Sequence, residues 1–232
     1  MTPPPNLPLK DALAEEVALL GEVKSGARRC AWRLWAASEQ SLAAPRAMEA
    51  KLTPGLAATA ARGWPCQFRV TGGDVTPQGP GVLSMATLFV AGQEGTNPIE
   101  SAYRQICAPI AQALAAFGIE SETGAVDGSY CDGLFNVVVD GLKFAGTAQR
   151  MSPMGEGRWA VLGQAMMILE GDDHSVTDAI NAFYRDAGLE KVVRSGVTVT
   201  LAELGIAEDA FVSALSAALG QDEEPEPDRQ DR

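Results

Sequence analysis

Residues 69–83 read RVTGGDVTPQGPGVL, a glycine- and proline-rich segment between two apolar runs that are typical of strands. Gly72 and Gly73 lack Cβ atoms, so the backbone N–H groups of this segment can approach a carboxylate, a phosphate or a thioester carbonyl closely. The segment holds too much glycine for a helix, and its ends are too apolar for a flexible linker. We therefore expect a loop that connects two strands and lies against a small ligand.

The pattern on both sides of this segment predicts a mixture of strands and helices. Apolar runs and the turn dipeptide Asp140-Gly141 predict strands over 29–37, 40–46 (an edge strand), 65–70, 81–90 and 158–170, and a hairpin over 136–150. Apolar spacings of three and four predict helices over 11–23, 98–119, 175–189, 200–204 and 207–220, with Asp11 and Ser175 as N-caps. Because strands and helices do not alternate strictly, we expect an α+β domain whose mixed, mostly antiparallel sheet is flanked by helices.

The composition indicates a single domain with a short extension at each end. The chain has 232 residues, of which 46% are apolar and 21% charged, as in ordinary globular proteins. Residues 1–9 are rich in proline and predict an extended segment. The C-terminal end carries acidic residues and no apolar side chain. We therefore expect one domain over 10–220 and an acidic disordered tail over 221–232.

The net charge and the cysteine content argue against several classes of function. The formal net charge of −12 repels a phosphate backbone and argues against a nucleic-acid partner. The four cysteines have no C-x-x-C spacing, and the single histidine, His174, lies in a polar turn, so no metal site is expected. No apolar run reaches 18 residues, and the N-terminus lacks the apolar core of a signal peptide. These features predict a cytoplasmic protein with reduced thiols and no membrane partner.

Two segments resemble those of the biotin/lipoate protein ligase superfamily, which includes lipoate-protein ligases and octanoyltransferases. Residues 72–83, GGDVTPQGPGVL, resemble the family segment GGxVTYHGPGxL, and residues 137–150, VVVDGLKFAGTAQR, resemble DGxKxxGxAxR. The segments follow the family's order, and the resemblance extends over residues 10–205. It implies a biotin/lipoate-ligase-like catalytic domain.

The resemblance also implies a set of site residues. It assigns the family's essential lysine to Lys143 and the nucleophilic cysteine of one octanoyltransferase family to Cys131. A thiolate suits the movement of an acyl group between thioesters, and a nearby ammonium favours the thiolate and stabilises a developing oxyanion. Ala145 is given no role. Substrate contacts are expected from Arg69, Thr71, Gly72, Gly73, Asp74, Val75, Gln78, Gly146, Gln149 and Gln164.

The chain lacks two histidines of the family pattern. Gln78 replaces the histidine of the family's Tyr-His pair, and Gln164 stands where a later histidine is usual, so no imidazole base is evident. Residues 206–232 are too few for the accessory domain of the larger bacterial lipoate ligases. These departures argue against full ATP-dependent ligation, and the missing histidines also favour a relative that binds its ligand without catalysis.

Some apolar side chains are candidates for the wall of a pocket that would hold an acyl chain. Trp32 and Trp35 are expected to share one strand face in the core, with a pocket wall as the alternative. Met85, Met166 and Met167 are expected in the core, with the lining of an acyl tunnel as the alternative, because methionine adapts its shape readily.

The first functional interpretation is the attachment of an octanoyl or lipoyl group to a lysine of a lipoyl carrier domain or of the glycine-cleavage H protein. Cys131 would take the acyl group from acyl carrier protein as a thioester, without metal or nucleotide. The alternative is a lipoate-protein ligase, or less fittingly a biotin ligase, that uses ATP and Mg²⁺; Lys143 and Arg69 would then bind an acyl-adenylate. A third interpretation is a ligand-binding relative without catalysis. In these interpretations the small ligand is lipoate or octanoate.

Overall fold

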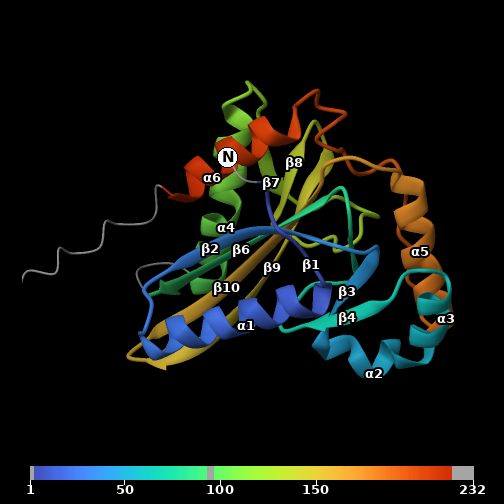
Figure 1. Cartoon of the computed structure of the whole chain (residues 1–232), viewed down its shortest axis with the longest axis horizontal. Coiled ribbons are helices and arrows are strands. Elements are labelled where there is room, and N and C mark those ends of the chain that lie inside the picture. Colours follow the sequence, from blue (N-terminus) through green and yellow to red (C-terminus); the bar gives the residue numbers. More distant parts are fainter. Residues whose placement is uncertain (1–2, 93–96, 221–232) are drawn as a thin grey trace, which may run out of the picture.

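The computed structural model describes residues 3–92 and 97–220 (Figure 1), so the acidic tail predicted for 221–232 lies outside the described residues. The strands are β1 (Asn6–Leu7), β2 (Ala31–Ala37), β3 (Ser41–Pro45), β4 (Cys66–Arg69), β5 (Thr76–Gln78), β6 (Val82–Ala91), β7 (Glu122–Gly124), β8 (Asn136–Val139), β9 (Leu142–Gly155) and β10 (Arg158–Ile168). The helices are α1 (Leu9–Ser25), α2 (Glu49–Leu52), α3 (Leu56–Ala61), α4 (Pro98–Ala115), α5 (Asp173–Asp186) and α6 (Glu208–Gly220).

The strands form two sheets, which confirms the α+β class and the mostly antiparallel pairing. The larger sheet has the order β1-β2-β6-β10-β9-β8-β7, and only its β1–β2 pair is parallel. The smaller sheet has the order β4-β3-β5, with β4 parallel and β5 antiparallel to β3. In Figure 1 the small sheet lies beside the large one, between α1 and the pair α3 and α5.

The two faces of the large sheet are covered by different helices. Leu83 of β6 and Met167 of β10 pack in the main core with side chains of α4 and α6. On the opposite face, Leu88 and Leu162 pack against Leu20 of α1. Because strand residues alternate between faces, one face of β6, β9 and β10 is left to meet α1 and the small sheet, and the candidate site lies there.

The hairpin predicted over 136–150 is present. Asp140 and Gly141 both have left-handed φ angles, 49° and 77°, as a two-residue turn between right-twisted strands requires. β8 and β9 then pair so that Val138 lies opposite Lys143. The turn therefore places Lys143 on a buried strand in the middle of the fold.

Two predicted N-caps were wrong. Helix α1 begins at Leu9 after Pro8, which leaves Asp11 in the first turn, because proline is compatible with a helix start. Helix α5 begins at Asp173, and the carboxylate of Asp172 accepts the N–H groups of His174 and Ser175. A carboxylate at this position satisfies two of the helix's free donors, so Ser175 lies inside the helix.

Three predicted elements differ from the structure. Segment 200–204 is a turn, because the Thr200 hydroxyl and the Glu203 carboxylate each bond to the other residue's backbone N–H. Helix α4 ends at Ala115 rather than at 119. Strand β3 is central rather than at an edge, because β4 and β5 pair on its two sides. The pairing partners of a short strand are set by tertiary contacts that its own residues do not reveal.

Candidate active site

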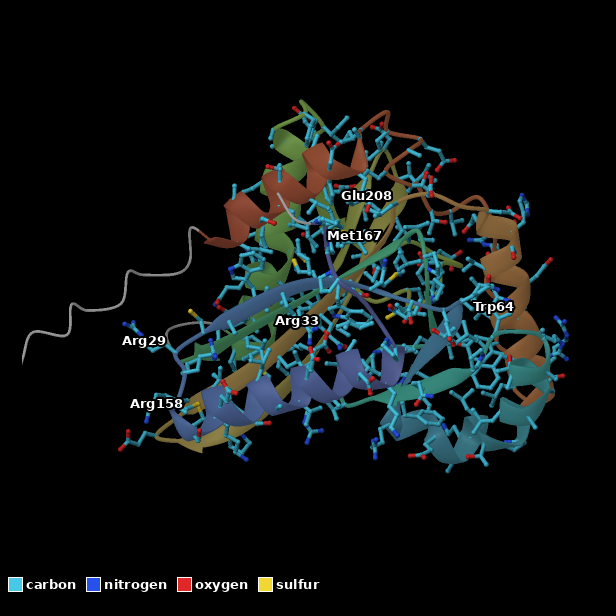
Figure 2. The ribbon with its side chains drawn as sticks, viewed as in Figure 1. Arg29, Arg33, Trp64, Arg158, Met167 and Glu208 are labelled. Atoms are coloured by element: carbon cyan, nitrogen blue, oxygen red, sulfur yellow. The ribbon has the colours of Figure 1, made fainter. Side chains whose placement is uncertain are left out.

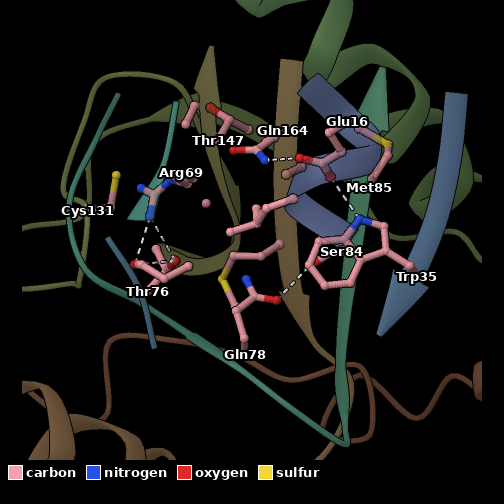
Figure 3. Close-up of a pocket in the computed structure, with 16 residues that line it drawn as sticks. Glu16, Trp35, Arg69, Thr76, Gln78, Ser84, Met85, Cys131, Thr147 and Gln164 are labelled. Atoms are coloured by element: carbon pink, nitrogen blue, oxygen red, sulfur yellow. Dashed lines mark hydrogen bonds between the residues drawn. The ribbon is translucent and has the colours of Figure 1, made fainter. Parts of the chain in front are cut away.

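A narrow pocket lies between the large sheet, the small sheet and α1 (Figure 3). The space within it that the centre of a water-sized molecule can reach is about 30 Å³, so the pocket is narrow in this structure. In Figure 3, Cys131 and Arg69 lie at one side, and Glu16 and Trp35 lie at the other. The lining residues are Leu13, Glu16, Trp35, Ala43, Arg69, Thr76, Gln78, Ser84, Met85, Cys131, Gly146, Thr147, Ala148, Gln164, Ala165 and Met166.

The structure brings five of the predicted site residues together on the pocket wall. They are Cys131, Arg69, Gln78, Gly146 and Gln164. The remaining predicted residues do not line the pocket, but several of them contact residues that do, as Lys143 contacts Cys131 and Thr71 contacts Gln164. The remaining residues are Lys143, Thr71, Gly72, Gly73, Asp74, Val75 and Gln149.

Cys131 belongs to residues 125–135, here called the cysteine loop, which connects β7 and β8. Its side chain is 7% exposed, and its φ of 53° is unusual for a residue other than glycine. The sulfur packs against the backbone of Gly73, where an added Cβ would lie 2.7 Å from Sγ. Gly73 also has a left-handed φ of 87°, so both the space and the backbone conformation require glycine there.

Arg69 holds residues 70–75, here called the glycine loop, in place. Its Nη1 donates to the carbonyl of Ala43 at 2.8 Å, and its Nη2 donates to the carbonyls of Gly72 at 2.9 Å and Asp74 at 2.7 Å. Burial lowers the pKa of this guanidinium, while nearby acidic groups and thiols oppose that shift. The charge thus organises the loop and lies at the pocket wall beside Cys131.

Lys143 is almost completely buried, with 1% of its surface exposed. Its Nζ donates to the backbone carbonyls of Tyr130 and Cys131, the latter at 3.0 Å, and lies 4.3 Å from the centre of the Tyr130 ring. Burial lowers its pKa to about 8. Gly146 leaves room for this side chain, because a Cβ there would lie 2.9 Å from Cε of Lys143. The ammonium therefore holds the backbone of Cys131.

The other predicted residues connect the glycine loop to its surroundings. Gly72 donates its N–H to the carbonyl of Gln149 at 3.3 Å, and the Thr71 hydroxyl donates to Oε1 of Gln164. Val75 is fully buried in the core between the small sheet and α5. Asp74 bonds to Tyr184 and Lys191, away from the pocket lining.

Sequence reasoning missed Glu16, a carboxyl group in the pocket wall. It is 1% exposed and accepts hydrogen bonds from Nε1 of Trp35 at 2.9 Å and from Nε2 of Gln164. Desolvation raises its pKa to about 7, although both hydrogen bonds act in the opposite direction. A signal was present: Glu16 has helical spacing with the apolar residues Leu13 and Leu20, so it falls on the buried face of α1.

The two tryptophans do not share a strand face, contrary to the sequence prediction. Residues three apart in a strand point to opposite faces, so Trp35 lines the pocket while Trp32 packs against the main core. Met85 and Met166 line the pocket, and Met167 lies in the main core.

The raised pKa of Glu16 predicts a pH-dependent stability. Between about pH 4.5 and 7 the folded state holds this proton more tightly than the unfolded chain, so the free energy of unfolding falls as pH rises, by at most about 3 kcal/mol. Urea unfolding of the wild type and of Glu16→Gln across this range will isolate the effect. The free energy of unfolding of the wild type should fall with pH relative to that of Glu16→Gln. The control Glu49→Gln, at an exposed site, should show the same pH dependence as the wild type. Parallel curves for Glu16→Gln and wild type would contradict the assignment.

These features define a class of protein: an α+β domain in which a glycine loop and a buried lysine contact a cysteine that lines a pocket between two sheets. The chain belongs to the family described as the lipoyl protein ligase A/B catalytic domain, whose model matches residues 8–220. That match confirms the superfamily inferred from the two sequence segments.

Relatives and solved structures agree with this family. The chain is 33% identical over 144 residues to an octanoyl-[GcvH]:protein N-octanoyltransferase of Kyrpidia tusciae, covering 60% of this chain and 49% of that protein. It is 30% identical over 224 residues to an uncharacterized protein of Cupriavidus necator, covering 91% and 87%. The chain thus spans about half the length of that named transferase.

The fold is shared with lipoate ligases. A crystal structure of lipoate-protein ligase A bound with ATP has a TM-score of 0.67 at 14% identity, covering 95% of this chain and 85% of that one. A bipartite lipoate protein ligase of Thermoplasma acidophilum, solved in a study of that ligase and its E2 lipoyl domain, has a TM-score of 0.59 at 15% identity, covering 95% and 83%.

Two further properties hold for residues 3–92 and 97–220. No helix in these ranges is long and apolar enough to cross a membrane. In the same ranges, no three His, Cys, Asp or Glu side chains gather so that they could hold a metal ion.

Proposed function

We propose that this domain transfers an octanoyl or lipoyl group to a lysine of a carrier protein through a thioester on Cys131. The observation that carries the proposal is the position of the Cys131 sulfur at the pocket, against Gly73 and on a backbone held by Lys143. The relatives named as transferases act on octanoyl-GcvH or lipoyl-GcvH, which supports a carrier-bound donor. Lipoate and octanoate groups are the ligands that we assign to the pocket.

The proposed reaction has two balanced steps. The Cys131 thiolate attacks the carbonyl of the donor thioester, the carbon–sulfur bond of the donor breaks, and the donor leaves as a thiolate that takes up a proton. The neutral amine of the acceptor lysine then attacks the Cys131 thioester, an amide forms, the amine loses its proton, and the Cys131 thiolate is released. Backbone N–H groups of the glycine loop and the charge of Arg69 would stabilise the oxyanion of both steps.

The acceptor is proposed to be a lipoyl carrier domain or a glycine-cleavage H protein, with an acylated H protein or acyl carrier protein as donor. The location remains the cytoplasmic one predicted from the sequence, which fits the four free cysteines.

An ATP-dependent ligase is the second candidate, because the solved structures that share the fold are lipoate ligases. Such an activity would need the charges of Arg69 and Lys143 for an acyl-adenylate. In this structure both charges bond to backbone carbonyls of the chain itself. A ligase would have to exchange these bonds for contacts with the adenylate, whereas the proposed transferase uses Lys143 where it lies, on the backbone of Cys131.

Intact-mass measurement will separate the candidates. The wild type is incubated with octanoyl-H protein or octanoyl-acyl carrier protein, and in parallel with octanoate, ATP and Mg²⁺; an apo-lipoyl domain is then added. The transferase predicts a hydroxylamine-sensitive octanoyl adduct from a thioester donor and octanoylation of the lipoyl domain without ATP. Octanoylation that requires ATP would overturn the proposal in favour of the ligase. Failure of every donor would favour a binder without chemistry.

Two exposed apolar side chains mark where the carrier would dock. Leu134 is 72% exposed in the cysteine loop, and Val192 is 70% exposed in the segment 187–207 between α5 and α6. The two segments are joined by the backbone bond from Arg194 to Gly128 and by the Arg194–Asp127 ion pair. Because the acceptor lysine must reach Cys131, we propose that the carrier covers the cysteine loop and the neighbouring segment 187–207.

We therefore expect the double variant Leu134→Ser/Val192→Ser to raise the KM for the lipoyl domain about tenfold and to leave kcat within a factor of two. Loss of two apolar contacts weakens docking without touching the sulfur. Steady-state transfer assays will measure this, with Ile99→Ser, an exposed apolar side chain on α4, as the control. An unchanged KM would place the docking surface elsewhere.

A further inference from the structure

Lys191 links two loops that meet at the candidate site. It lies in the segment between α5 and α6, and its Nζ donates to Oδ2 of Asp74 and lies 3.9 Å from Oδ1 of Asp132. Asp74 is 8% exposed, and its other oxygen accepts from the Tyr184 hydroxyl and from the N–H of Val75 at 3.1 Å. The glycine loop is therefore anchored to α5 and to Lys191.

Both carboxylates are direct chain neighbours of the groups that touch at the reaction centre. Asp74 follows Gly73, whose Cβ position lies 2.7 Å from the Cys131 sulfur, and Asp132 follows Cys131 itself. An ammonium that binds Asp74 and Asp132 thus holds the glycine loop and the cysteine loop together on either side of this contact.

The charge of Lys191 matters as much as its bonds. Without it, the carboxylates of Asp74 and Asp132 would lose the ammonium that contacts both of them, and negative charges near Cys131 disfavour a thiolate and an oxyanion. Partial burial opposes the charged form of Lys191, but the hydrogen bond to Asp74 and the charges of Asp74 and Asp132 outweigh it and raise its pKa. The charges of Arg69 and Lys143 also act on these groups, but the N–H groups of both side chains bond to backbone carbonyls, whereas Lys191 bonds directly to the carboxylate of Asp74.

We propose that Lys191 is a positioning residue for acyl transfer: it clamps the glycine loop to the cysteine loop and neutralises the two carboxylates beside Cys131. The inference rests on the proposed function for the role of Cys131. Lys191 acts on the sulfur of Cys131 through Asp74 and Asp132 and needs no contact with the acyl group.

The reactivity of Cys131 toward iodoacetamide tests the proposal without any acyl donor. The rate at pH 7.5 is followed by mass spectrometry of the peptide that contains Cys131, so the other cysteines do not interfere. Lys191→Met should lower this rate about tenfold, and Lys191→Arg should keep at least half of it. Adding Asp132→Asn to Lys191→Met should restore part of the rate, because it removes one uncompensated charge. Lys51→Met, at an exposed lysine of α2, should behave as the wild type.

The outcomes separate the two proposals. A Lys191→Met rate within twofold of the wild type, in a protein with an unchanged melting temperature, would overturn the role of Lys191. If that variant does not fold, Lys191→Gln, which still donates a hydrogen bond to Asp74, is judged by the same criterion. A lowered rate that Asp132→Asn does not restore would leave only the clamp and refute charge compensation. Because alkylation requires no acyl donor, failure of acyl transfer in the wild type would leave this result standing.

Discussion

The Cys131→Ser protein is expected to form no hydroxylamine-sensitive adduct with octanoyl-H protein and to transfer octanoyl groups at least about 10³-fold more slowly than the wild type. The sulfur lies at the pocket in contact with Gly73, so a serine hydroxyl would occupy nearly the same place. Position is therefore retained while the nucleophile is lost, because a hydroxyl without a base stays protonated at neutral pH. The Gln residues at 78 and 164 offer no such base.

The measurement combines intact mass with the rate of octanoylation of a lipoyl domain. Cys66→Ser is the matched control, because Cys66 is partly exposed on β4, and its pKa is raised by burial to about 12. We expect this control to acylate and to transfer like the wild type. An adduct of Cys131→Ser that resists neutral hydroxylamine would indicate an oxygen ester, and residue 131 would still be the position that is acylated. Full transfer by Cys131→Ser would contradict the covalent mechanism.

The second large effect is expected at Lys143. Lys143→Met should lower transfer about 10²-fold or more, because its ammonium holds the carbonyls of Tyr130 and Cys131 and so fixes the strained backbone of the nucleophile. Lys143→Arg should not rescue, since the space beside Gly146 already admits the lysine with little clearance. Melting temperatures of both variants will show whether the fold is retained.

The lowered pKa of Lys143 adds a pH signature to this prediction. Burial brings the pKa to about 8, so the ammonium is charged at neutral pH and is lost as pH rises through about 8. The rate of Cys131 acylation by a fixed donor should therefore decline above that pH in the wild type. Lys143→Met should show no such decline, because its side chain has no proton to lose. A decline of the same size in both proteins would exclude Lys143 as the titrating group.

Much of the fold was predictable because it depends on local patterns. Asp140-Gly141 between two apolar runs leaves few conformations other than a tight hairpin, and the apolar runs over 81–90 and 158–170 indicated the strands β6 and β10. The central place of β3 was not predictable, since a short strand with apolar residues on both faces can pair at many positions. The turn at 200–204 was missed because side-chain bonds to the backbone compete with helix formation there.

The residues of the candidate site likewise fall into those that could be predicted from the sequence and those that could not. Lys143 and Cys131 could be singled out because their segments resemble those of the ligase superfamily, and Gly72 and Gly73 because residues without a Cβ let the backbone approach a ligand. Glu16 and Lys191 were not assigned to the site, and Trp35 was expected in the core with a pocket wall as the alternative. The spacing of Glu16 with Leu13 and Leu20 indicates a buried position in the helix, but only the packing of α1 against the sheets shows that this position faces the pocket.

By itself, the sequence of this protein determined the two segments that contain the site and the strands and turns that carry them, because local backbone preferences act over a few residues. Only the tertiary structure decided that the Cys131 sulfur meets Gly73, that Lys143 bonds to the backbone of Cys131 rather than pointing into the pocket, and that Glu16 lies buried in the pocket wall. These contacts join residues far apart in the chain. They form only when the sheets and α1 exclude water and leave each polar group with the partner that packing brings to it.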